Sequence, residues 1–194
     1  MNHLFKPHRN YHQLQTKFLS RNVATIFSGV RLSEKIKIEV KNKKNTLSEN
    51  SPGFKPKLAA ITVGDNPASK IYLNRKHEAA KFCGIYFDML SLPADSNEEK
   101  IIDLVHDLNS DHSVHGVIVQ LPLPPHMDEV RVCNSVDPMK DVDGFTQTSL
   151  GRVVQGLDDR SLIPCTSLAV KRIIKEIGIR QRFNQEHKSN THFE

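Results

Sequence analysis

The 194-residue sequence contains no long hydrophobic run and no cysteine pattern that would assign it to a class at once. No apolar stretch is long enough for a membrane span or for the core of a secretory signal. Its three cysteines, Cys83, Cys133 and Cys165, include no CxxC pair, so we expect reduced thiols that pack as small apolar side chains. The ten histidines show no metal-binding spacing, and we expect no metal site.

Glycine-rich phosphate-binding loops are also missing from the sequence. Neither the GxGxxG pattern of dinucleotide-binding folds nor the Walker A pattern of P-loop proteins occurs anywhere in it. We therefore expect no loop in this chain that cradles the phosphates of a nucleotide.

Acidic residues are absent from the first 33 residues, which carry five basic ones. The formal net charge is +5, from 27 basic and 22 acidic residues, so setting those five aside leaves 22 of each sign. The neutral body gives no reason to expect nucleic-acid binding. A basic, acid-free segment with serine and threonine is typical of a mitochondrial presequence, which we predict for residues 1–25, with the mitochondrial matrix as destination. The alternative is a basic tail on a cytoplasmic protein.

The body of the chain alternates between helical and strand patterns. Its strands read as continuous apolar runs, which are typical of a mostly parallel sheet with helices on both faces. We therefore predict an α/β fold, a three-layer α-β-α domain over residues 26–179. The predicted helices are residues 33–44, 67–83, the segment opened by a capping box at 96–99, a short helix at 128–136, and 166–177; the predicted strands are 58–63, 85–92 and 114–121.

Two segments of this body are less clear. Residues 33–44 fit a helix through Leu32, Ile36 and Val40, although Ile36, Ile38 and Val40 also alternate like a strand. Residues 45–57 contain two prolines and a glycine and are predicted to be a loop. From residue 180 to 194 periodicity disappears, which predicts a disordered tail.

Polar side chains that suit chemistry gather near the predicted ends of strands. Ser69, Tyr72 and Lys76 lie on one face of the helix at 67–83, and Gln120 interrupts the apolar run of the third strand, where it needs a hydrogen-bond partner. In parallel sheets, ligands bind outside the carboxyl ends of the strands. A lysine there serves as an acid or base when its surroundings lower its pKa, but an exposed helix lysine is usually only solvated.

Two aspartates follow in the turn at residues 140–144. For Asp141 and Asp143 the simpler interpretation is turn chemistry, because aspartate side chains hydrogen-bond nearby backbone groups. The turn lacks the further acidic ligands of a calcium loop. A ligand-binding role therefore depends on what lies next to the turn in space.

Several segments taken together match one family in order and spacing. They are residues 63–72 (VGDNPASKIY), Lys76, 84–85, 116–124 (GVIVQLPLP), 137–145 (DPMKDVDGF), 151–152 and 164–166. On these motifs the chain resembles the methylenetetrahydrofolate dehydrogenase/methenyltetrahydrofolate cyclohydrolase family of one-carbon metabolism, over about residues 26–179. With its basic leader it is most similar to the mitochondrial bifunctional members.

The resemblance implies a role for each matching residue. Lys76 would be the catalytic lysine, and Gln120 would hydrogen-bond and tune it. Tyr72 would stack along the folate, Asp143 would bind the amide and amino edge of the pterin, and Ser69 would support the site. The family also implies a tetrahydrofolate derivative as substrate, NAD or NADP as cofactor, and a homodimer.

The sequence departs from the family after residue 179. Members continue into a Rossmann domain that binds the cofactor, and the remaining residues here do not resemble it. We therefore expect a truncated isoform in which dehydrogenase activity is lost, cyclohydrolase activity is weak at best, and the last helix is under-buried. The alternative is a non-catalytic isoform that binds folate or pairs with full-length subunits. Smaller departures are Ser149, Ser167 and Ala169.

Overall fold

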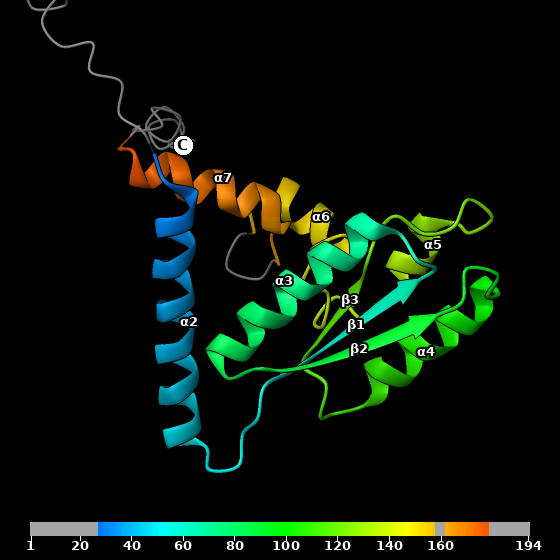
Figure 1. The fold of residues 1–194 in the computed structure, drawn as a ribbon, viewed down its shortest axis with the longest axis horizontal. Helices are drawn as coiled ribbons and strands as arrows, with labels where there is room; N and C mark the ends of the chain where they lie inside the picture. Colours follow the sequence, from blue (N-terminus) through cyan, green and yellow to red (C-terminus); the bar gives the residue numbers. More distant parts are fainter. Residues whose placement is uncertain (1–26, 158–161, 179–194) are drawn as a thin grey trace, which may run out of the picture.

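Three parallel strands form the sheet on which the rest of the fold is built (Figure 1). The computed structural model describes residues 27–157 and 162–178. The sheet order is β2-β1-β3, with β1 at Lys57–Val63, β2 at Tyr86–Leu92 and β3 at Gly116–Val119. The predicted leader at residues 1–25 and tail at 180–194 lie outside the described residues.

Alternate residues of the central strand face two different helices. Ala59 and Ile61 pack in a cluster with Ile101 and Val105 of helix α4 (Glu98–Ser110), whereas Ala60 packs with Leu73 of helix α3 (Pro67–Cys83). Because side chains of a strand alternate between faces, α3 and α4 must cover opposite sides of the sheet. Figure 1 shows this arrangement. The predicted α/β fold with a parallel sheet is confirmed.

Helix α3 has both of its predicted ends, and each end has a local cause. The side chain of Asn66 accepts hydrogen bonds from the backbone N–H groups of Ala68 and Ser69, and Pro67 occupies the first turn. The helix stops at Gly84, which has a left-handed backbone with φ of +72°. These local signals fix which side chains of α3 face the carboxyl end of β1.

The predicted capping box at residues 96–99 is wrong. The N-cap of α4 is Asn97, not Ser96, and its Oδ1 accepts a hydrogen bond from the Glu99 N–H at 3.1 Å. The carboxylate of Glu99 does not turn back onto the helix start, because it pairs with Arg131 at 2.6 Å. Asparagine is as good an N-cap residue as serine, so Asn97 can cap α4 in place of Ser96.

Helix α2 spans Gly29–Asn50 and is longer than the predicted 33–44. The strand interpretation of this segment and the loop assigned to residues 45–50 are therefore wrong, and the loop begins at Ser51. The last turns of α2, which include Lys43 and Lys44, are mostly polar and have no buried residue, but lysine favours a helix. The helix ends just before Pro52, because proline cannot continue a helix.

The remaining helices are short and follow β3. They are α5 (Glu129–Asn134), α6 (Gln147–Val154), which the sequence pattern did not predict, and α7 (Cys165–Glu176). Figure 1 shows α7 crossing one end of α2. Two ion pairs join α7 to α2: Lys35–Glu176 at 2.9 Å and Arg172–Glu39 at 2.5 Å.

Helix α7 contains no buried residue, which confirms that it is under-buried. Its apolar side chains Leu168 and Val170 are about half exposed. Within residues 27–157 and 162–178, no helix combines the length and the apolarity that crossing a bilayer requires.

Candidate active site

Helix α3 presents Ser69, Tyr72 and Lys76 on one face, but the three side chains differ in their surroundings. Ser69 is buried, and its Oγ donates to the carbonyl oxygen of Leu121 at 3.4 Å. The side chain of Lys76 is 27% exposed, and Tyr72 is 61% exposed. Ser69 therefore ties the helix to the segment after β3, whereas Tyr72 and Lys76 remain accessible to a ligand.

Gln120 is a direct partner of Lys76. The Nζ of Lys76 lies 3.4 Å from the Oε1 of Gln120, and the Nε2 of Gln120 donates to the carbonyl oxygen of Leu121 at 2.8 Å. The third strand ends at Val119 and not at residue 121 as predicted, so Gln120 stands just beyond the strand. Its amide is held at one end by the backbone, which directs the oxygen toward Lys76.

The turn after Lys140 brings a carboxylate to the same lysine. The Oδ2 of Asp143 lies 3.4 Å from the Nζ of Lys76 in a pair whose carboxylate side chain is 15% exposed. Sequence spacing alone did not predict the contact between Lys76 and Asp143. Gln120 and Asp143, which the resemblance indicated, therefore both contact Lys76.

Asp141 has a different position from Asp143, because it is buried and holds the turn together. Its carboxylate accepts hydrogen bonds from the N–H groups of Phe145 at 3.1 Å and Thr146 at 2.8 Å. The hydroxyl of Thr146 in turn donates to the Oγ of Ser149 at 2.9 Å. Turn chemistry thus explains Asp141, and the buried Ser149 has a partner despite its departure from the family pattern.

Lys140 anchors the start of the same turn. Its Nζ donates to the carbonyl oxygens of Leu108 at 2.9 Å, Asn109 at 2.7 Å and Asp111 at 2.8 Å, at the end of α4. These carbonyls have no further helical donors, so a lysine satisfies them well. The backbone that carries Asp143 is therefore held from both sides.

Cys165 lies beside Asp143 at the start of α7. Its Sγ is 3.6 Å from the carbonyl oxygen of Val142 and 3.8 Å from the Oδ1 of Asp143. Burial raises the pKa of the Cys165 thiol, the Asp143 carboxylate raises it further, and the Lys76 ammonium lowers it.

The three cysteines are all free, which confirms the predicted reduced thiols. Cys83 and Cys133 are buried as expected, and burial raises the pKa of Cys133 to about 11. The prediction of a buried position is wrong for Cys165: the residue as a whole is exposed, although its sulfur lies against Val142 and Asp143 and is partly desolvated there. The helix that it opens has little to pack against, which explains the difference.

A cleft of about 670 Å³ lies over these residues, a size that suits a small organic ligand. It is lined by Tyr72, Lys76, Gln120 and Asp143 together with Val119, Leu121, Phe145, Pro164, Cys165, Thr166, Ser167 and Ala169. Phe145 and Thr166 were not among the predicted site residues, although both stand inside the matching motifs. The structure thus brings four of the five predicted side chains to one cleft, with Ser69 behind it.

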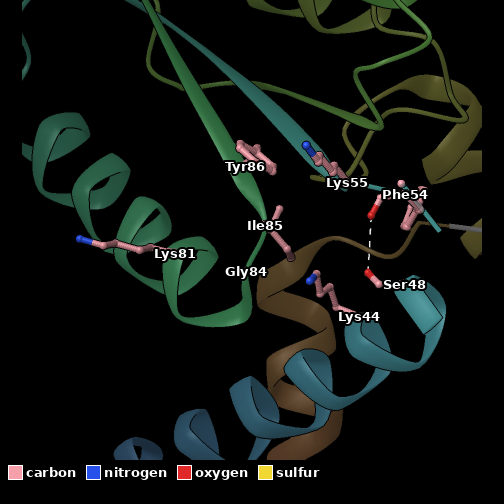
Figure 2. A pocket seen from close by; sticks show the side chains of 9 residues that line it. Lys44, Ser48, Phe54, Lys55, Lys81, Gly84, Ile85 and Tyr86 are labelled. Carbon is pink, nitrogen blue, oxygen red and sulfur yellow. Dashed lines mark hydrogen bonds between the residues drawn. The ribbon is translucent and has the colours of Figure 1, made fainter. Parts of the chain in front are cut away.

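A second groove of about 490 Å³ lies elsewhere, between the end of α2 and the start of β2 (Figure 2). Three lysines are among the residues that line it, Lys44, Lys55 and Lys81. Figure 2 shows the Lys81 side chain pointing away from the other two, so the three amines do not converge. None of the predicted site residues lines this groove.

Metal ligands do not gather in the part of the chain that the structure describes. No group of three or more histidine, cysteine, aspartate or glutamate side chains there has the arrangement of a metal site. Asp141 and Asp143 instead contact backbone N–H groups and a lysine, respectively.

Comparisons with known proteins agree on one family. The model of the tetrahydrofolate dehydrogenase/cyclohydrolase catalytic domain matches residues 27–143. The bifunctional protein FolD of Aquifex aeolicus is 44% identical over 158 residues, which are 81% of this chain and 53% of that protein. The human mitochondrial bifunctional methylenetetrahydrofolate dehydrogenase/cyclohydrolase 2 is 43% identical over 160 residues, which are 82% of this chain and 45% of that protein.

Solved structures give the same result. The 5,10-methylenetetrahydrofolate dehydrogenase of the silkworm Bombyx mori matches with a TM-score of 0.77 and 38% identity, over 81% of this chain and 53% of that chain. The Trypanosoma brucei dehydrogenase-cyclohydrolase, solved with NADP and an inhibitor, matches with a TM-score of 0.75 and 30% identity, over 80% and 52%. The chain spans about half the length of the curated relatives it matches.

Proposed function

The chain belongs to the tetrahydrofolate dehydrogenase/cyclohydrolase family, and from this premise we propose that its cleft binds a one-carbon derivative of tetrahydrofolate and hydrolyses the methenyl form. The observation that carries the proposal is the contact of Lys76 with the neutral amide of Gln120, in a cleft of ligand size. A cationic one-carbon bridge is attacked by water, and an amine next to that carbon is placed to take the proton.

The proposed reaction needs little more than a placed base. The water oxygen bonds to the methenyl carbon while the amine of Lys76 takes one proton from that water. One carbon–nitrogen bond of the adduct then breaks: the released nitrogen gains a proton, the adduct's hydroxyl loses its proton, and a formyl group remains on the other nitrogen, with one proton released overall. Gln120 accepts a hydrogen bond from Lys76 and orients it without adding a charge. General acid–base catalysis by a placed side chain contributes about 10²- to 10⁴-fold.

Substrate binding is proposed for three other residues. Asp143 would accept hydrogen bonds from the amide and amino edge of the pterin, since a carboxylate binds two parallel N–H donors well. The exposed ring of Tyr72 offers a flat surface for stacking. Ser69 would act through its hydrogen bond to Leu121, which fixes α3 against the residues that follow β3.

The loop after β1 does not suit the pyrophosphate of a dinucleotide. The loop after β1 is 64–66 (GDN) and opens α3 through the Asn66 cap, without the repeated glycines that let a backbone approach a pyrophosphate. We therefore propose hydrolysis rather than oxidation as the reaction of these residues.

The test is methenyltetrahydrofolate hydrolysis by the purified chain, corrected for the spontaneous reaction. We expect Lys76→Met to lower the enzyme-dependent rate by about 100-fold or more. Lys70→Met is the matched control, because Lys70 lies on the same helix, is exposed and does not line the cleft. Equal rates for Lys76→Met and the unchanged protein would refute the proposed chemistry.

A second candidate is a folate-binding protein without turnover that pairs with longer family members. The exposed apolar side chains of α7 favour it, because such a face is typical of an unfilled interface. Calorimetry and size-exclusion chromatography separate the candidates: folate binding without Lys76-dependent hydrolysis, together with co-elution with a longer member, would support the second.

We also propose the mitochondrial matrix as the location of the chain. The acid-free basic segment at residues 1–33 supports this, as does the similarity to a human protein named as mitochondrial. Residues 1–33 fused to a fluorescent protein test it, and a diffuse cytoplasmic signal would contradict it.

A further inference from the structure

We propose that a groove between α2 and α3 binds the glutamate end of the folate, with Arg75 and Lys37 as the cations that hold its two carboxylates. This inference rests on the proposed function, because it takes a tetrahydrofolate derivative as the ligand of the cleft. Such a molecule consists of a pterin, an aminobenzoyl ring and a glutamate, in that order. The described residues that line the cleft include no cation apart from Lys76, which the proposed reaction uses. The carboxylates of the glutamate therefore need a partner outside the cleft.

The groove has a volume of about 580 Å³ and lies where α3 packs against α2 (Figure 1). It shares no lining residue with the cleft. Most of its polar side chains carry hydrogen-bond donors, which suits carboxylate oxygens as ligand groups. The residues that define the groove are Ser33 and Lys37 of α2 and Asn74, Arg75, Glu78 and Phe82 of α3.

Arg75 and Lys76 lie on opposite sides of Tyr72 on the surface of α3. A helix turns by about 100° per residue, so Lys76 stands about 40° to one side of Tyr72 and Arg75 about 60° to the other. Residues three apart on a helix have Cβ atoms about 5–6 Å apart. Because the glutamate is joined to the aminobenzoyl ring by a single amide, its carboxylates come within reach of Arg75 when that ring stacks on Tyr72. The pterin then lies on the side of Lys76.

Lys37 and Arg75 are available to a ligand. Among the residues that the structure describes, no ion pair includes either of them. The Nζ of Lys37 stands 5.4 Å from the centre of the Phe82 ring, a contact that holds the amine beside the groove without neutralising its charge. Lys41 contacts the same ring at 5.0 Å and adds a further positive charge nearby.

Glu78 opposes these cations, because its carboxylate also lines the groove. The described lining residues thus carry two positive charges, on Lys37 and Arg75, against one negative charge, so the groove remains positive. A glutamate with two carboxylates is attracted to it, whereas a neutral group of the same size is not. Recognition at this groove therefore depends on charge, and a change of charge alone tests it.

The test compares the binding of tetrahydrofolate with that of its diamide, in which both carboxylates of the glutamate are replaced by neutral amides of nearly the same size. Calorimetry with the purified chain gives both dissociation constants and does not require turnover. The diamide should bind about 5- to 25-fold more weakly, because the water-screened attraction of two unit charges about 4 Å apart gives up to about fivefold for each carboxylate. Raising the salt concentration should narrow this difference.

Variants of the groove should change the ratio of the two dissociation constants in both directions. Arg75→Gln and Lys37→Gln should each lower the ratio by about two- to fivefold, and Glu78→Gln should raise it. Lys100→Gln is the matched control, because it removes the same charge from an exposed position on α4, at the opposite face of the sheet. The control should keep the ratio of the unchanged chain.

Three outcomes would contradict the proposal. Equal dissociation constants for tetrahydrofolate and its diamide would overturn the glutamate site and leave the proposed function standing, because both ligands would still bind. An equal fall of the ratio in Arg75→Gln and Lys100→Gln would also overturn the site, since the effect would then come from the net charge of the chain. Absence of binding by both tetrahydrofolate and methenyltetrahydrofolate would overturn the proposed function, and the glutamate site with it.

Discussion

Gly144, which directly follows Asp143, is the position where one methyl group should disturb the site most. Its backbone has φ of +69°, and a Cβ placed there would stand 2.4 Å from the carbonyl oxygen of Leu162, 2.8 Å from the nitrogen of Pro164 and 3.1 Å from the carbonyl carbon of Ile163. All three are backbone atoms, so no side-chain rotation relieves the overlap. The segment 162–164 leads into α7 and forms part of the cleft wall.

The cost of Gly144→Ala has two parts. A left-handed backbone costs a non-glycine residue about 1–2 kcal/mol. Forcing extra volume into a packed position costs about 1–3 kcal/mol more. Gly156 separates the parts, because its φ is +72° and a Cβ there would meet nothing within 4 Å. Gly156→Ala should therefore lose only the first part.

Urea unfolding of the two variants beside the unchanged chain measures both parts. We expect Gly156→Ala to lower the free energy of unfolding by about 1–2 kcal/mol and Gly144→Ala by about 2–5 kcal/mol. An unchanged slope of the free energy of unfolding against urea concentration would show that the variants expose the same surface area on unfolding as the unchanged chain. Equal losses in the two variants would refute the argument, since segment 162–164 would then not be packed against the turn.

Two further predictions concern Cys165 and the core. Burial and then Asp143 raise the pKa of Cys165 while Lys76 lowers it, so at about pH 8 Asp143→Asn should speed its alkylation about fivefold and Lys76→Met should slow it. The rates follow from peptide mass spectrometry with iodoacetamide, and changes in the same direction would contradict this electrostatic account. Ile101→Ala, at a fully buried position, should lower the free energy of unfolding by about 2–5 kcal/mol. Val130→Ala, at a position 61% exposed, should change it by less than about 0.5 kcal/mol, and similar urea curves for both would place Ile101 outside the core.

Elements with a local cause could be predicted from the sequence. The strands around Ala60 and Ile118 are buried on both faces, so their sequences are continuous apolar runs. Helix α3 carries a cap residue at one end and a glycine at the other. Helix α6 gave no such signal. It begins at the Thr146 cap, whose backbone N–H donates to the carboxylate of Asp141. The start of α6 therefore depends on how the preceding turn folds.

The site could be predicted as a set of residues but not as a set of contacts. Motif spacing and resemblance indicated Lys76, Gln120 and Asp143, and the parallel sheet made it reasonable that they meet at one edge. The pairing of Lys76 with Asp143 joins residues 67 positions apart and depends on how the turn closes. Sequence reasoning therefore assigned Asp143 to the ligand alone and missed its contact with the lysine.

The cleft consists of two halves that are held with different strength. Lys76 and Gln120 stand on α3 and at the end of β3, which pack into the core through Leu73 and Ile118. The opposite wall belongs to α7, which has no buried residue and is joined to α2 by exposed or half-exposed ion pairs. Surface ion pairs of this kind contribute about 0–1 kcal/mol each. The lysine and its amide are thus set by the core, and the wall beside Asp143 is the part whose geometry a ligand or a partner can change at low cost.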